Sequence, residues 1–88
     1  MPGYTLNILG VEISFKTDAP AERVNRAKVL LEERFKVLEE RGRKLSREKL
    51  LIYLSLGLAD DYLLLKDQAL EVDKKIAELL DRLDSENI

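Results

Sequence analysis

A long apolar stretch in the second half of the chain limits the fold more than any other feature. The segment EKLLIYLSLGLADDYLLL covers residues 48–65 and carries no charge between Lys49 and Asp60. Drawn as a helix, it has apolar residues on every side, and such a helix must be buried on most of its circumference. A chain of 88 residues offers little else with which to bury it. We therefore expect a second copy of the chain to cover part of this surface.

The composition of the chain excludes two means by which small domains are often stabilised, disulfides and thiolate metal sites. The chain has no cysteine and no histidine, which excludes disulfides, thiolate metal sites and histidine general bases. Domains of this size often need a metal, disulfides or a partner subunit, and oligomerisation is the route that remains. Neighbouring carboxylates such as Asp60 and Asp61 point about 100° apart on a helix and do not converge. The sequence predicts no enzyme, with no catalytic, cofactor-binding or metal-binding residues.

The N-terminal residues predict a β-hairpin. Residues 4–8 and 11–16 alternate between apolar and polar side chains, as half-buried strands do. The apolar positions are Tyr4, Leu6 and Ile8 in the first strand, and Val11, Ile13 and Phe15 in the second. Gly10 suits a tight turn between them because it adopts a positive φ without penalty. Leu9 would disfavour a left-handed conformation, so the turn type stays open.

Two helices are expected after the hairpin. Asp18 or Ala19 is a plausible cap of the first helix, and Gly42 is a plausible stop. Ser46 is then the expected cap of a second helix that reaches about residue 85 and spans roughly 60 Å. That length is too great to pack fully on a hairpin and one shorter helix. The predicted fold is α+β and oligomeric, with a head over residues 1–64 and a coiled-coil stalk over residues 65–88.

The spacing of apolar residues in the second helix predicts an oligomerisation seam. The stalk positions recur at intervals of 4, 3, 4, 3 and 4 residues, which is the heptad pattern of a coiled coil. They are Leu65, Ala69, Val72, Ile76, Leu79 and Leu83. Upstream, the seam continues through Leu51, Leu54, Leu58 and Tyr62 at intervals of 3, 4 and 4, a local stutter.

Several features favour a cytoplasmic protein. The apolar run ends at Asp60, short of the roughly 20 residues needed to span a bilayer, so we expect a buried helix and no membrane insertion. The segment MPGYTLNILG lacks the basic and apolar regions of a signal peptide. The absence of cysteine also fits a reducing compartment.

A cluster of basic residues between the two helices is the main candidate for contact with a partner. Five basic residues fall within positions 41–49, opposed only by Glu48; they are Arg41, Arg43, Lys44, Arg47 and Lys49. We call residues 41–49 the basic junction. It is either a solvated surface or a binding site for an acidic partner.

Binding to nucleic acid is the less favoured interpretation of this basic cluster. A strand followed by two helices resembles ribbon-helix-helix repressors, which read DNA with a pair of strands. The outward residues of the second strand are Glu12, Ser14 and Lys16, whose charges cancel. The alternative function is therefore a generic coiled-coil scaffold, or an antitoxin-like regulator that contacts nucleic acid through the basic junction.

The order and spacing of these segments resemble the bacterial cell-division protein family ZapA. The hairpin matches in NILGVEISF, the end of the first helix in LEERGRKLSREKL, and the apolar start of the second helix in LGLADDYL, residues 56–63. The resemblance covers nearly the whole chain. Val11 stands where the family often has an arginine, and Gly57 stands where it often has an asparagine.

This resemblance implies a non-enzymatic adaptor. Proteins of the family dimerise through their heads, form tetramers through their stalks, and bind and bundle filaments of FtsZ, the tubulin-like division GTPase, at midcell. It implies that charged head residues make the FtsZ contact, with Arg43 and Glu48 at matching positions. The predicted FtsZ-binding set is Arg41, Arg43, Lys44, Arg47, Glu48 and Lys49.

Overall fold

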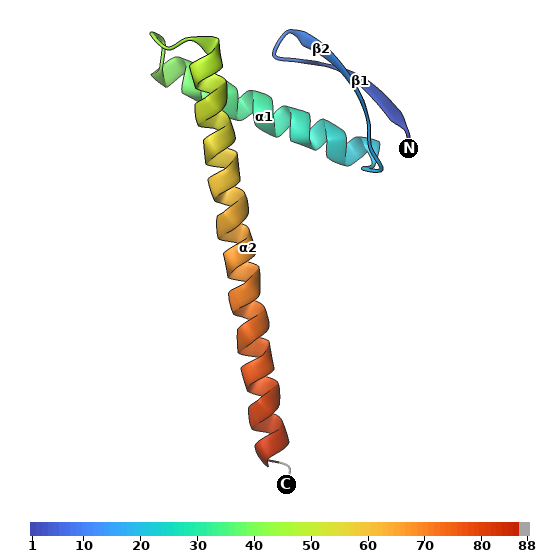
Figure 1. The fold of residues 1–88 in the computed structure, drawn as a ribbon, viewed down its shortest axis with the longest axis vertical. Coiled ribbons are helices and arrows are strands. Elements are labelled where there is room, and N and C mark those ends of the chain that lie inside the picture. The colour runs from blue at the N-terminus through green and yellow to red at the C-terminus, as the bar shows by residue number, and fades with distance from the viewer. Residues whose placement is uncertain (87–88) are drawn as a thin grey trace. The chain divides into compact units, whose positions relative to one another are not determined.

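The computed structural model describes residues 1–86 as a hairpin followed by two helices (Figure 1). Strands β1 (Gly3–Ile8) and β2 (Val11–Lys16) precede helices α1 (Ala21–Arg41) and α2 (Arg47–Glu86). The predicted α+β fold with a long second helix is confirmed. Internal contacts divide the chain into one unit over Met1–Leu54 and a second that starts at Ser55. The predicted boundary between head and stalk, after residue 64, stays a prediction.

The register of the hairpin places its apolar side chains together. Strands β1 and β2 are antiparallel, and the apolar residues of one strand lie opposite those of the other, in the pairs Tyr4–Phe15, Leu6–Ile13 and Ile8–Val11. Since successive side chains of a strand alternate between faces, all six share one face, as the sequence predicts. The other face is polar, and the hydroxyls of Thr5 and Ser14 lie 3.0 Å apart on it.

The turn between the strands is left-handed at both of its residues. Leu9 has φ 54° and Gly10 has φ 81°, the pattern of a two-residue type I′ turn, which matches the twist of the strands. The sequence left this turn type open because leucine disfavours such a backbone. A left-handed conformation costs a residue with a side chain roughly 1–2 kcal/mol, so contacts with the rest of the protein must hold Leu9 in place.

Helix α1 starts later than the sequence predicts, and the predicted cap is wrong. Its N-cap is Pro20, without a side-chain hydrogen bond, in place of Asp18 or Ala19. The first hydrogen bond of the helix runs from the N–H of Val24 to the carbonyl of Pro20 at 3.1 Å, which makes Pro20 the cap. The backbone of Ala19 is held from outside the helix, because its N–H donates to Thr17 Oγ1 at 3.2 Å and its carbonyl accepts from the Tyr4 hydroxyl at 2.8 Å.

The connection between the helices follows the predicted stop and start signals. Helix α1 ends at Arg41, and the N–H of Gly42 closes it on the Leu38 carbonyl at 2.8 Å. Gly42 has φ −113°, so glycine is favoured here by the limited space and not by a left-handed backbone. A Cβ atom at this position would lie 2.9 Å from a methyl of Leu45. Ser46 caps α2 as predicted, since its hydroxyl accepts the N–H of Lys49 at 3.2 Å.

The core within a single chain is small. Among the described side chains, the buried apolar ones are Phe35, Leu50 and Leu54, each at most 5 % exposed. Only a part of the apolar stretch is therefore covered within its own chain, while Ile52 and Tyr53 stay exposed. In the described part of the chain, no helix is both long and apolar enough to cross a membrane.

Candidate functional site

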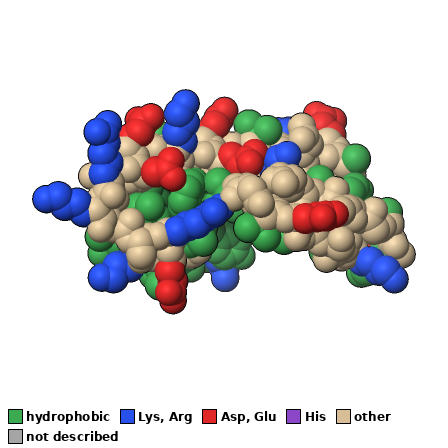
Figure 2. All heavy atoms as spheres, turned by 90° about the horizontal axis from the view of Figure 1, so that it is seen from above, with side chains coloured by type: hydrophobic (Ala, Val, Ile, Leu, Met, Phe, Trp, Pro, Cys, Tyr) green, Lys and Arg blue, Asp and Glu red, His purple; other side chains and the backbone are tan. Residues whose placement is uncertain are grey.

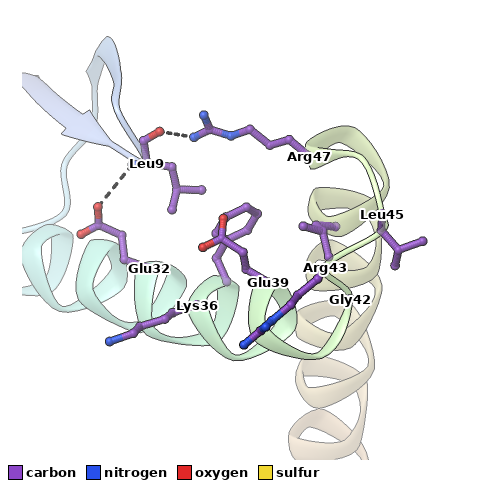
Figure 3. A pocket seen from close by; sticks show the side chains of 10 residues that line it. Leu9, Glu32, Lys36, Glu39, Gly42, Arg43, Leu45 and Arg47 are labelled. Carbon is purple, nitrogen blue, oxygen red and sulfur yellow. Dashed lines mark hydrogen bonds between the residues drawn. The ribbon is translucent and has the colours of Figure 1, made fainter.

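Charged side chains from both helices hold the strained hairpin turn. The N–H of Leu9 donates to Glu32 Oε2 of α1 at 3.2 Å, and the guanidinium of Arg47, in the first turn of α2, donates to the Leu9 carbonyl. Figure 3 shows Glu32 reaching the turn from α1 below it and Arg47 reaching it from the start of α2 at the right. The guanidinium carbon of Arg47 also lies 5.8 Å from the centroid of the Phe35 ring, within cation–π range. These contacts tie the hairpin, α1 and the start of α2 to a single residue.

A pocket of ≈ 450 Å³ lies beneath this turn. Its apolar lining comes from Phe35 and Leu50 of the core, together with Leu9 and Leu45. Its charged lining comes from two elements, α1 and the basic junction, and consists of Glu32, Lys36, Glu39, Arg43 and Arg47. All of these residues belong to the unit over Met1–Leu54. An apolar floor surrounded by charges of both signs is typical of a protein-binding site.

The charged residues of the basic junction are all exposed. Arg41 ends α1, Arg43 and Lys44 lie in the turn, and Arg47, Glu48 and Lys49 form the start of α2. All six side chains are exposed, and Figure 2 shows Lys and Arg side chains projecting at the left end of the molecule, over the α1–α2 connection. The structure thus brings the six predicted residues into one short segment. Their role in binding FtsZ stays a prediction.

Sequence reasoning missed the residues that surround Arg47. Leu9 is the turn residue that Arg47 contacts, Glu32 holds it from the other helix, and Lys36 and Glu39 line the pocket. The sequence does carry one signal, because Leu9 precedes Gly10 where an asparagine or aspartate is usual for a type I′ turn. An unusual residue at such a position indicates that tertiary contacts fix the turn. Arg47 also differs from the other basic residues of the junction, because its guanidinium already donates a hydrogen bond to the Leu9 carbonyl.

Helix α2 exposes most of the predicted oligomerisation seam. Tyr62, Leu65, Val72, Ile76, Leu79 and Leu83 are all more than half exposed, and Ala69 is exposed as well. Leu51 and Leu58 are half-buried, and Leu54 lies in the core of its own chain. A continuous exposed apolar stripe of this length is unusual for a monomeric protein. The seam itself stays a prediction.

A second apolar stripe, which the sequence reasoning missed, runs along α2 beside the first. Leu56, Leu63 and Leu70 recur at intervals of seven residues and are 66 %, 53 % and 59 % exposed. With about 100° per residue, Leu63 lies roughly 100° around the helix from Tyr62 in the seam. The seven-residue interval was the signal that could have revealed it. Two apolar stripes on one helix allow it to contact two neighbouring helices.

Removal of the Arg47 guanidinium tests whether it holds the hairpin turn. We expect Arg47→Met to lower the free energy of unfolding by about 1–2 kcal/mol, because a charge-assisted hydrogen bond to a strained turn is lost while the aliphatic stem is kept. Urea denaturation followed by circular dichroism measures the change. Lys49→Met, in the same turn of α2, is the matched control and should change stability by less than about 0.5 kcal/mol. Equal effects of the two variants would contradict the role of Arg47.

These features define a class of protein: a small α+β unit whose hairpin is held against two helices, the second of which is long and exposes apolar stripes. Among the described residues, no group of histidine, cysteine, aspartate or glutamate side chains could hold a metal ion. The sequence profile of the family described as "Cell division protein ZapA" matches residues 4–87. The chain therefore belongs to the ZapA family of cell-division proteins. No curated protein and no solved structure matches it.

Proposed function

We propose that this protein is a non-enzymatic adaptor that binds FtsZ filaments and cross-links them into bundles, and thereby promotes assembly of the Z-ring at midcell. The observation that carries this proposal is the family match over residues 4–87. The structure supports it through the exposed apolar surface of α2 and the charged surface at its start. The first feature fits self-assembly and the second fits contact with a partner.

Self-assembly through two interfaces is the first part of the proposal. The heads join in a dimer, and the stalks join two dimers into a tetramer through the predicted seam. The second apolar stripe of α2, formed by Leu56, Leu63 and Leu70, favours a tetramer in preference to a two-stranded coiled coil. A two-stranded coiled coil buries one stripe on each helix, whereas a helix in a four-helix bundle contacts two neighbours.

Contact with FtsZ through the basic junction is the second part. The six predicted residues are exposed and adjacent, and the five positive charges among them favour a partner with an acidic surface. An assembly with several heads binds a filament more tightly than one head does, because the second contact benefits from a high effective concentration. Heads that bind different filaments cross-link them.

Co-sedimentation with polymerised FtsZ tests the proposal. We expect the protein to pellet with FtsZ polymers and to shift them into bundles that sediment at low speed, whereas protein without FtsZ stays in the supernatant. A gel-shift assay with duplex DNA is the parallel experiment, because the alternative function is nucleic-acid binding through the same junction. A DNA shift without FtsZ co-sedimentation would refute the adaptor and favour the regulator.

A further inference from the structure

The pocket beneath the hairpin turn has the size and the lining of a binding site. Its volume of ≈ 450 Å³ lies within the roughly 300–1,000 Å³ that ligand pockets occupy. Phe35 and Leu50 are among the most buried residues of the chain, yet they also line this open pocket. Since each of the two is only 5 % exposed, an apolar group that entered the pocket would contact mainly Leu9 and Leu45, with Phe35 and Leu50 at its base.

The charged rim of the pocket is continuous with the basic junction. Arg43 and Arg47 belong to both, and Lys36 adds a third positive charge from α1. The acidic residues of the rim are Glu32, whose carboxylate accepts the N–H of Leu9, and Glu39. Figure 3 shows Lys36, Glu39 and Arg43 around the pocket, with Arg47 above it. A segment bound at the junction would therefore pass directly over the apolar floor.

We infer that this pocket receives an apolar side chain from an acidic segment of the polymer that binds the basic junction. The inference rests on the proposed function and adds a second kind of contact to it. Charges at the rim steer an acidic partner and fix its orientation. A buried apolar side chain at the centre, shielded from water by that rim, supplies most of the binding energy in many interfaces.

The positive charge of the basic junction indicates that the bound segment is acidic. The basic junction carries five positive charges and one negative charge, which favours acidic residues beside the inserted side chain. A segment that offered charge alone would leave the accessible apolar lining, mainly Leu9 and Leu45, in contact with water. The pocket and the junction together therefore favour a partner segment in which an apolar residue is flanked by carboxylates.

Leu45 is the position at which the apolar contact can be tested without any change of charge. It lies in the turn between the helices, lines the pocket and is 38 % exposed. Leu45→Ser removes apolar lining and changes no charge. The matched control is Val29→Ser, because Val29 is 43 % exposed and lines a different hollow on α1 together with Arg23 and Arg26.

The experiment measures the affinity of the full-length protein for FtsZ polymers by co-sedimentation at several salt concentrations. We expect Leu45→Ser to weaken binding about tenfold, because a leucine that becomes largely buried only in the complex is lost, and Val29→Ser to change it less than about twofold. Leu45→Met keeps the apolar character and should restore binding. Circular dichroism and light scattering verify that the variants keep the helicity and the oligomeric state of the wild type.

The outcomes separate the inference from the proposed function. If the wild type binds FtsZ and Leu45→Ser binds equally well, the pocket is not used and the inference fails, while the adaptor role stands. If Leu45→Ser changes the oligomeric state in the absence of FtsZ, the pocket is an interface between copies of the chain and the inference fails. If the wild type does not bind FtsZ at any salt concentration, both the proposed function and the inference fail.

Discussion

Replacing Ile76 by aspartate is expected to split the assembled protein into folded dimers. Ile76 is 51 % exposed within a single chain, so the substitution removes little packing from the chain itself. In the assembled stalk the same position lies in the predicted seam, and an unpaired carboxylate buried there would cost several kcal/mol in each copy. The stalk contacts should therefore dissociate while the contacts between heads persist. Size-exclusion chromatography with light scattering would show tetramers for the wild type and dimers for the variant.

Lys75→Asp is the control for the effect of charge on the stalk. It lies next to Ile76 in the sequence, about 100° away around the helix, and it changes the net charge by more than Ile76→Asp does. We expect it to remain tetrameric, because Lys75 does not belong to the predicted seam and its side chain stays in water in the assembled stalk. An Ile76→Asp variant that stays tetrameric would show that the seam is wrongly placed. One that loses its helicity would show that the stalk and the head do not assemble independently.

Reversing two charges of the basic junction is expected to abolish FtsZ bundling. In the variant Arg43→Glu, Lys44→Glu, both side chains are exposed in the turn between the helices, so helicity and tetramer formation should be unchanged. The substitution converts an attractive surface into one that an acidic partner repels. Bundling by the wild type should also weaken as salt rises, because exposed charges are screened over about 8 Å near physiological ionic strength. Light scattering of FtsZ polymers measures both effects.

The control for this variant reverses two charges elsewhere on the same unit. Arg23→Glu, Arg26→Glu makes the same change in net charge near the start of α1, where both arginines are exposed. Bundling should persist with this control. Arg47 is left out of the test because its contacts with Leu9 and Phe35 would mix a loss of binding with a loss of stability. If the junction variant still bundles FtsZ fully, the basic junction is not the binding site, but the adaptor role is not refuted.

The sequence by itself determined the elements of this fold and most of their ends. Alternation of apolar residues predicts both strands and places Tyr4 and Phe15 on one face, as the register confirms. Gly42 and Ser46 mark the end of α1 and the start of α2. The helix ends depend on contacts within a few residues, and the strand pairing depends on a short hairpin, so local patterns indicate both. The predicted cap of α1 failed because Tyr4, distant in sequence, and the neighbouring Thr17 hold Ala19 outside the helix.

Only the tertiary structure decided how the turn is held and where the pocket lies. Leu9 adopts a left-handed backbone against its own preference, and the contacts that hold it come from Glu32 and Arg47, which lie 23 and 38 residues away. The same approach of three elements creates the pocket and gives Arg47 a structural role. The local sequence shows only that Leu9 is unusual before Gly10; it cannot show which residues hold the turn or line the pocket, because these features arise where segments that are distant in the sequence meet in space.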